Sequence, residues 1–107
     1  NLQFSIQLVN TDSQIHDVDV WAAINGTDLA NSNSRFSVPN SHGGVDGHLI
    51  AALNLFLSMQ AGDYVELYWH TTNTSVSLEH LPSGSSPTRP ATPSVIATMA
   101  FVSSIPE

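Results

Sequence analysis

The sequence contains no cysteine and no lysine, and only 10% of its residues are charged. Without cysteine the chain can form no disulfide, thiolate metal site or cysteine nucleophile, so stability must come from packing and association. Its only cations are Arg35 and Arg89, and the formal net charge is -7 at pH 7. Such a surface repels phosphate backbones, so we expect no nucleic acid partner.

Long apolar runs are also missing from the sequence. No stretch approaches the ~20 residues of a membrane span, and the N-terminus lacks the basic and then apolar order of a signal peptide. We therefore expect no membrane partner. The 107 residues suffice for one domain with one core. Because the chain begins at Asn1, we expect that it is processed or belongs to a longer polypeptide.

Alternation of apolar and polar residues, interrupted by turn residues, dominates the chain. It predicts strands over 2–8, 15–24, 34–38, 65–70, 76–78 and 95–102. The Asn25-Gly26 pair is a hairpin signal. In the second strand Val18 and Val20 share one face, while Asp17, Asp19 and Trp21 share the other. Short strands at this spacing indicate an all-β fold, an antiparallel β-sandwich or jelly roll.

The segment "HLIAALNLFLSMQ" fits two patterns. Leu49, Leu53, Phe56 and Leu57 would form a helical stripe, whereas alternate residues from Leu49 to Leu57 fall on one face of a strand. We favour a strand, because the neighbouring segments are extended.

The stretch "SMQAGDYVELYWHTT" raises the question of a reactive site, since it holds Asp63, Glu66 and His70. Gly62 and Asp63 are turn residues, and the apolar positions alternate from Val65 onward. A turn followed by a half-buried strand explains the pattern better than a catalytic carboxylate.

Proline and serine fill the later segment "LPSGSSPTRPATP". Proline lacks a backbone donor, so we expect an extended surface loop without regular pairing. We also predict that "SPTRPATP" is an ordered arm at a subunit contact, where Arg89 meets a carboxylate or backbone carbonyls.

His42, Asp46 and His48 have a spacing that could wrap a divalent metal ion. The alternative, that these are solvated residues of a glycine-rich loop, is stronger because no further strong ligand is visible. His16, His70 and His80 are expected to be exposed or interface residues.

Other catalytic templates are absent from the sequence. No Gly-x-Ser-x-Gly turn and no glycine-rich phosphate loop occurs. The carboxylates Asp17 and Asp19 show no apolar enclosure that would raise a pKa. We therefore expect no enzyme, no catalytic residue, no metal and no cofactor.

The motifs "NTDSQIHDVDVW", "VPNSHGGVDGH" and "SPTRPATPSV", in this order, resemble virion proteins of tailed bacteriophages. The "NG" turn and "AGDYVEL" are similar to the jelly-roll module of the tumour necrosis factor and complement C1q type. The resemblance covers nearly the whole chain, 1–107. It implies a single jelly-roll domain, commonly a homotrimer, that serves as a capsid decoration or cement protein on the particle surface.

A full module of that type carries strands before the position of Asn1. We therefore expect the missing sheet edge to be supplied by preceding residues, by a neighbouring chain, or not at all. The alternative function is a tail-fibre or appendage module that binds a host-surface glycan or receptor through exposed aromatic residues. Candidates for oligomer or capsid contacts are Trp21, Tyr64, Tyr68, Trp69 and Arg89.

Overall fold

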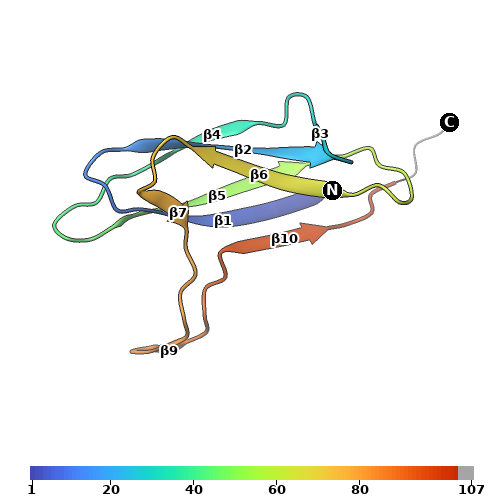
Figure 1. Ribbon diagram of the computed structural model, residues 1–107. Coiled ribbons are helices and arrows are strands. Elements are labelled where there is room, and N and C mark those ends of the chain that lie inside the picture. Colours follow the sequence, from blue (N-terminus) through green and yellow to red (C-terminus); the bar gives the residue numbers. More distant parts are fainter. Residues whose placement is uncertain (104–107) are drawn as a thin grey trace.

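Two antiparallel sheets packed face to face make up the body of the protein (Figure 1). The computed structural model describes residues 1–103, and all of their regular structure is β-strand, as predicted. The strands are β1 (Leu2–Asn10), β2 (His16–Ile24), β3 (Thr27–Asp28), β4 (Ser34–Val38), β5 (Gly47–Leu55), β6 (Val65–Thr71), β7 (Val76–Leu78), β8 (Gly84–Ser85), β9 (Thr88–Arg89) and β10 (Val95–Met99).

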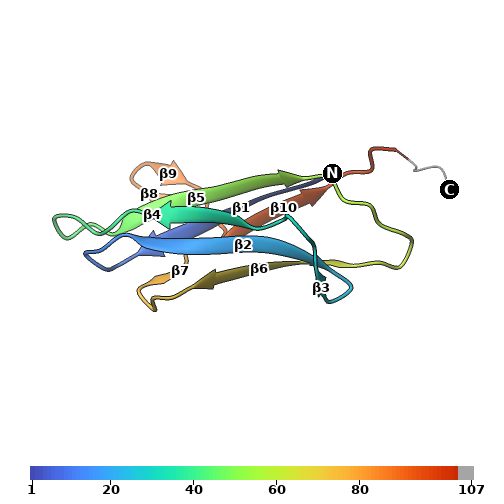
Figure 2. The ribbon, with the colours of Figure 1, turned by 90° about the horizontal axis from the view of Figure 1, so that it is seen from above.

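Each sheet is built around one central strand. In the β1 sheet, β1 pairs with β5 on one side and with β10 and β7 on the other. In the β2 sheet, β2 lies between β6 on one side and β4 and β3 on the other. Figure 1 and Figure 2 show that β2 and β4 lie in one layer and that β1 and β5 lie in the other. The chain therefore crosses between sheets at β1–β2, β4–β5, β5–β6 and β6–β7.

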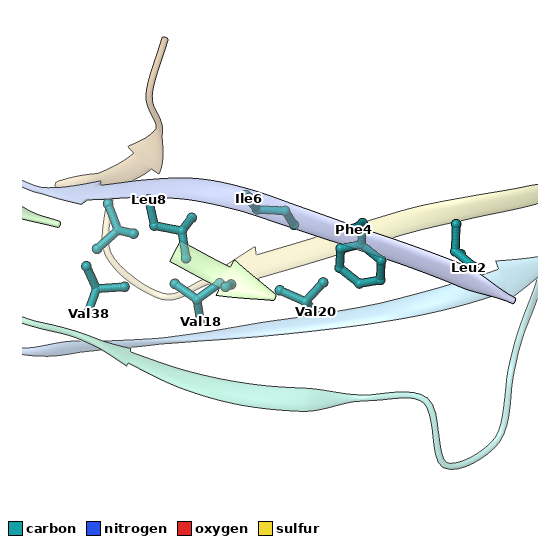
Figure 3. Close-up of a cluster of buried hydrophobic side chains, with 9 residues drawn as sticks. Leu2, Phe4, Ile6, Leu8, Val18, Val20 and Val38 are labelled. Carbon is teal, nitrogen blue, oxygen red and sulfur yellow. The ribbon is translucent and has the colours of Figure 1, made fainter. Parts of the chain in front are cut away.

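The core lies between the two central strands (Figure 3). Alternate residues of β1 point inward, and Val18 and Val20 of β2 meet them from the other sheet. The cluster comprises Leu2, Phe4, Ile6, Leu8, Val18, Val20, Val38, Ala51 and Val76. Burying a Leu, Val, Ile or Phe side chain contributes about 1.5–3 kcal/mol each, so this cluster is the main source of stability.

Two local predictions are confirmed. The segment after Gly47 is strand β5, and Leu49, Ala51, Leu53 and Leu55 lie on its inner face against the core. Asn25 and Gly26 have φ angles of 53° and 81°. Those left-handed values at both central residues are what a tight hairpin turn requires, and they connect β2 to β3.

The proline-rich segment contradicts the expectation of a loop without pairing. Between β7 and β10 the chain leaves the β1 sheet and forms an arm that projects from the sandwich (Figure 1), here defined as residues 80–93. Its two legs pair through β8 and β9 and through a bridge between Leu81 and Thr92. The prolines were compatible with pairing because Gly84, Ser85, Thr88 and Arg89 carry the ladder.

The arm is anchored at its base by one residue of β1. The N–H of Gln7 donates to the carbonyl of Ser94 at 2.8 Å, and the carbonyl of Gln7 accepts the N–H of Glu79 at 2.9 Å. Thus β7 and β10 pair with successive parts of β1, and the arm is an excursion between them.

One side of the sandwich is not closed. Here β6 is an edge of its sheet and β10 is an edge of the other sheet, and the two strands lie apart (Figure 1). Trp69 is registered with buried Val20, and Met99 with buried Leu2, so both lie on inner faces. They nevertheless remain 37% and 54% exposed. We call the strands β6 and β10 with these inner residues the open edge.

Candidate functional site

The outer face of the β2 sheet carries a dense group of polar and aromatic side chains. Asp17, Asp19 and Trp21 point outward from β2, as their alternation with buried Val18 and Val20 requires. Their registered partners on the flanking strands are Ser37, Arg35, His70 and Tyr68, and Glu66 and Asp28, the partners of Ala23, lie on the same face.

Trp21 and Tyr68 are cross-strand neighbours, and their rings are stacked. The ring centroids are 5.8 Å apart with an interplanar angle of 16°. The indole N–H of Trp21 also donates to Asp28 Oδ1 at 2.9 Å. The indole is therefore fixed both by a ring against one face and by a hydrogen bond at its edge.

A shallow hollow lies beside this indole. It is lined by Trp21, Asp28, Leu29, Asn31 and Asn33 and has a volume of about 490 Å³. Tyr68 belongs to β6, on the opposite side of β2 from these residues, so the hollow lies on the side of Trp21 away from Tyr68. A second shallow hollow, on the outer face of the β1 sheet, has no charged or aromatic side chain except Phe4 of the core in its lining.

Asp19 is neutralised by its neighbours. Arg35 donates to both carboxylate oxygens, at 3.0 and 3.1 Å, and Asn33 donates to Oδ1 at 3.2 Å. These hydrogen bonds, led by that from Arg35, lower the pKa of Asp19. Asp19 is thus an anchor for Arg35 and Asn33, and not a raised-pKa acid.

Asp63, which raised the question of a reactive site, has a structural role. Its carboxylate accepts the N–H of Gln60 at 2.8 Å and the side-chain N–H of Asn25 at 2.8 Å. These bonds, that from Gln60 first, lower the pKa of Asp63. Glu66 lies on the exposed outer face, where its charge raises the pKa of Tyr68. The lowered pKa of Asp63 is the opposite of what a general acid requires.

The residues of the metal hypothesis do not converge. His42 lies in a turn, where its backbone forms a β-bridge with Val45. His48 lies on β5 and pairs with Glu79 at 2.9 Å across the β1 sheet. Within residues 1–103 no three His, Asp or Glu side chains gather in a way that could hold a metal ion. His16 contacts Asp12 at 2.6 Å, in the turn between β1 and β2.

The five contact candidates fall on different surfaces. Trp21 and Tyr68 belong to the outer face of the β2 sheet, whereas Trp69 lies on the open edge. Tyr64 is exposed just before β6, and Arg89 lies within the arm, where it donates to the carbonyl of Pro87 at 3.0 Å. This carbonyl belongs to the arm itself, so the contact of Arg89 with a neighbouring subunit stays a prediction.

Sequence reasoning missed three residues of the hollow: Asp28, Asn31 and Asn33. They come from a short segment in which Asn31 has a φ of 63°, and only the fold brings that segment beside Trp21. A local signal did exist, since three asparagines or aspartates within six residues indicate turns.

Comparisons with protein-family models, with curated proteins and with solved structures found no significant match. Nothing in the described part of the chain is a helix that could cross a lipid bilayer.

Proposed function

We propose that this protein is a non-enzymatic virion structural protein, a capsid decoration or cement protein that associates with copies of itself at the particle surface. The observation that carries the assembly part of this proposal is the open edge. The resemblance of the sequence motifs to virion proteins of tailed bacteriophages supports the place of the assembly.

The open edge leaves inner-face apolar residues uncovered. Val95 and Met99 of β10 are 39% and 54% exposed, although their partners on β1, Ile6 and Leu2, are buried. Phe101, just beyond β10, is 83% exposed. Apolar side chains grouped on one side of a small domain are typical of an interaction surface.

Within the open edge, β10 lacks the features that keep strands from pairing. The strand β10 has the sequence VIATM, with no charge and no proline, and its five residues are all exposed. Natural edge strands are usually protected by lysine, proline or a bulge. The absence of such protection supports pairing or packing with another chain as the role of this edge.

A second copy is the occupant that we propose. The strand β10 carries no charge, so two such edges can approach without bringing like charges together, and closed symmetric oligomers are the usual result of self-association. The resemblance implies a homotrimer and a jelly roll of the tumour necrosis factor and C1q type, and both belong to this proposal. The antiparallel sandwich itself is observed.

Stabilisation of a capsid would follow from mass action. Copies that bind only the closed, expanded shell favour that shell over ruptured or unexpanded states. Particles with and without the protein should therefore differ in the temperature or osmotic stress at which they release DNA. Equal stability together with loss of adsorption to host cells would overturn the decoration role.

The second candidate function is that of a tail-fibre or appendage module that binds a host-surface glycan. The specific observation in its favour is the hollow beside the stacked Trp21, which has a rim of polar side chains. Copy number per particle distinguishes the two roles, because hundreds of copies indicate decoration and a few tens or fewer indicate a fibre.

A further inference from the structure

We infer that the hollow lined by Trp21, Asp28, Leu29, Asn31 and Asn33 is a binding site for a neutral pyranose sugar, whose apolar face would lie on the indole of Trp21. This inference rests on the second candidate function and is independent of assembly through the open edge.

The indole of Trp21, which forms one wall of the hollow, is held in place by two neighbouring side chains. Tyr68 is stacked on one face of the Trp21 indole, and Asp28 accepts the indole N–H. Because the ring is already held, little side-chain freedom is lost when a ligand covers its other face. Trp21 is half-buried, and the flat, immobile aromatic surface that it leaves accessible is suited to the C–H groups of a sugar ring.

The rim of the hollow is also held in place. The buried hydroxyl of Ser32 accepts the N–H of Ala22 at 3.1 Å and lies 2.8 Å from the carbonyl of Leu29. These contacts pin the segment between β3 and β4 to the central strand. Asn33 is positioned by its hydrogen bond to Asp19. The loop is thus fixed at its middle and at its end.

The polar groups on the rim match sugar hydroxyls. Within residues 1–103 the side-chain amide of exposed Asn31 makes no hydrogen bond, and Asn33 uses only its Nδ2 group. Asp28 uses only Oδ1, for Trp21. The rim therefore offers a free amide, an amide oxygen and a carboxylate oxygen beside an aromatic face, the mixture of donors and acceptors that a hydroxylated ring can satisfy.

Charge excludes the other common ligands of such a surface. Asp17, Asp19, Asp28 and Glu66 share this face, and its one arginine, Arg35, is engaged by Asp19, so an anionic ligand would be repelled. A quaternary ammonium ion prefers to be enclosed by several aromatic faces. Here Trp21 is the one aromatic residue that lines the hollow, and Tyr68 lies on the other side of Trp21.

The test is a titration of the ¹⁵N-labelled protein, followed by NMR. The probes are methyl glycosides of glucose, galactose, mannose and N-acetylglucosamine, with choline and inorganic phosphate as cationic and anionic comparisons. Titration to about 50 mM makes dissociation constants well above ~1 mM measurable. The chain has two tryptophans, so the indole signal of Trp69 on the open edge is an internal control.

At least one glycoside should shift the Trp21 indole signal in a saturable manner and leave that of Trp69 unchanged. Asn31→Gly removes the free amide but suits the positive φ at this position, so the fold should persist while affinity falls at least fivefold. Trp21→Ala should abolish binding, and Trp69→Phe should not alter it.

Three results would overturn the inference: no shift with any glycoside, a shift by choline or phosphate alone, or unchanged affinity in Asn31→Gly. Light scattering on the same samples separates these results from the proposed assembly. A trimer that binds no glycoside contradicts only the sugar site, whereas a monomer that binds one contradicts only the assembly.

Discussion

Asn25 and Asp63, 38 residues apart, join the turn after β2 to the turn before β6 through a hydrogen bond of 2.8 Å. Asn25 also accepts the N–H of Tyr64 through its side chain, at 3.0 Å. The two turns close the same end of the β2 sheet, next to the first registered pair of β2 and β6, Ile24 and Val65.

This connection predicts that Asn25→Gly lowers the melting temperature. Glycine accepts the φ of 53° at this position, so the loss reports the side-chain hydrogen bonds and not backbone strain. Asn54→Gly, on the exposed face of β5, is a control for glycine in an exposed position. Thermal unfolding followed by circular dichroism measures both, and equal or smaller loss for Asn25→Gly would contradict the structural role of Asn25.

Acid should destabilise the fold through three aspartates. Hydrogen bonds to His16, Arg35 and Gln60, respectively, are the leading causes that lower the pKa values of Asp12, Asp19 and Asp63 from the ordinary 3.8. A lowered folded-state pKa contributes stability above the unfolded pKa, and this is lost as pH falls through the folded value. Urea midpoints should therefore drop below about pH 4.

The variant Asp19→Asn isolates one of these contributions. It removes the titrating group while keeping a side chain of the same shape beside Arg35. The decline of its urea midpoint below about pH 4 should be shallower than that of the unmodified protein. An identical pH profile would show that Asp19 is not among the groups responsible.

A close backbone approach predicts the largest single loss of stability. Gly47 opens β5, and a Cβ at this position would collide with the backbone of Pro39 and Asn40. Gly47→Ala must displace the backbone at the entry to β5, so we expect a loss of about 3 kcal/mol or more. The control is Gly43→Asn, because Gly43 has open space and a φ of 59° that asparagine tolerates. Similar urea unfolding for both variants would contradict this contact.

The arm yields a prediction about association. The guanidinium of Arg89 lies against Gly84 and donates to Pro87, so it holds the two legs of the arm together. If the arm contacts a neighbouring subunit, Arg89→Ala should weaken association about threefold to tenfold and leave the sandwich folded. Arg35→Ala is the matched control, since Arg35 lies on the outer face of the β2 sheet. Sedimentation at several concentrations measures both, and equal constants would remove the arm from the interface.

Strands could be read from the sequence because alternation is a local property. The inward set Val18 and Val20 and the outward set Asp17, Asp19 and Trp21 follow from period two alone. The sequence predicts an arm at "SPTRPATP" but not the pairing within it, because the ladder is carried by residues that lie between the prolines. The hollow and the open edge depend on which strands become neighbours, and that choice is made by the whole fold.

The stacked pair illustrates the same limit. The sequence presents Trp21 and Tyr68 as aromatic contact candidates, but their stacking depends on the register of β2 with β6. The two residues are 47 positions apart, and the sequence pattern does not set that register. Likewise, Trp69 lies on the inner face of β6, as the alternation from Val65 onward requires, yet it remains partly exposed because β10 lies apart from β6 (Figure 1). Facing direction is local, while coverage depends on the opposite sheet.

Light scattering with size-exclusion chromatography tests the central claim, self-association through the open edge, most directly. At micromolar concentration the unmodified protein should have the mass of a trimer of the 11.5 kDa chain, and Met99→Lys should be a folded monomer. The control Ile50→Lys, on the outer face of β5, should remain a trimer. A monomeric unmodified protein that is also not trimeric in the particle, or a Met99→Lys variant that remains trimeric, would contradict the account.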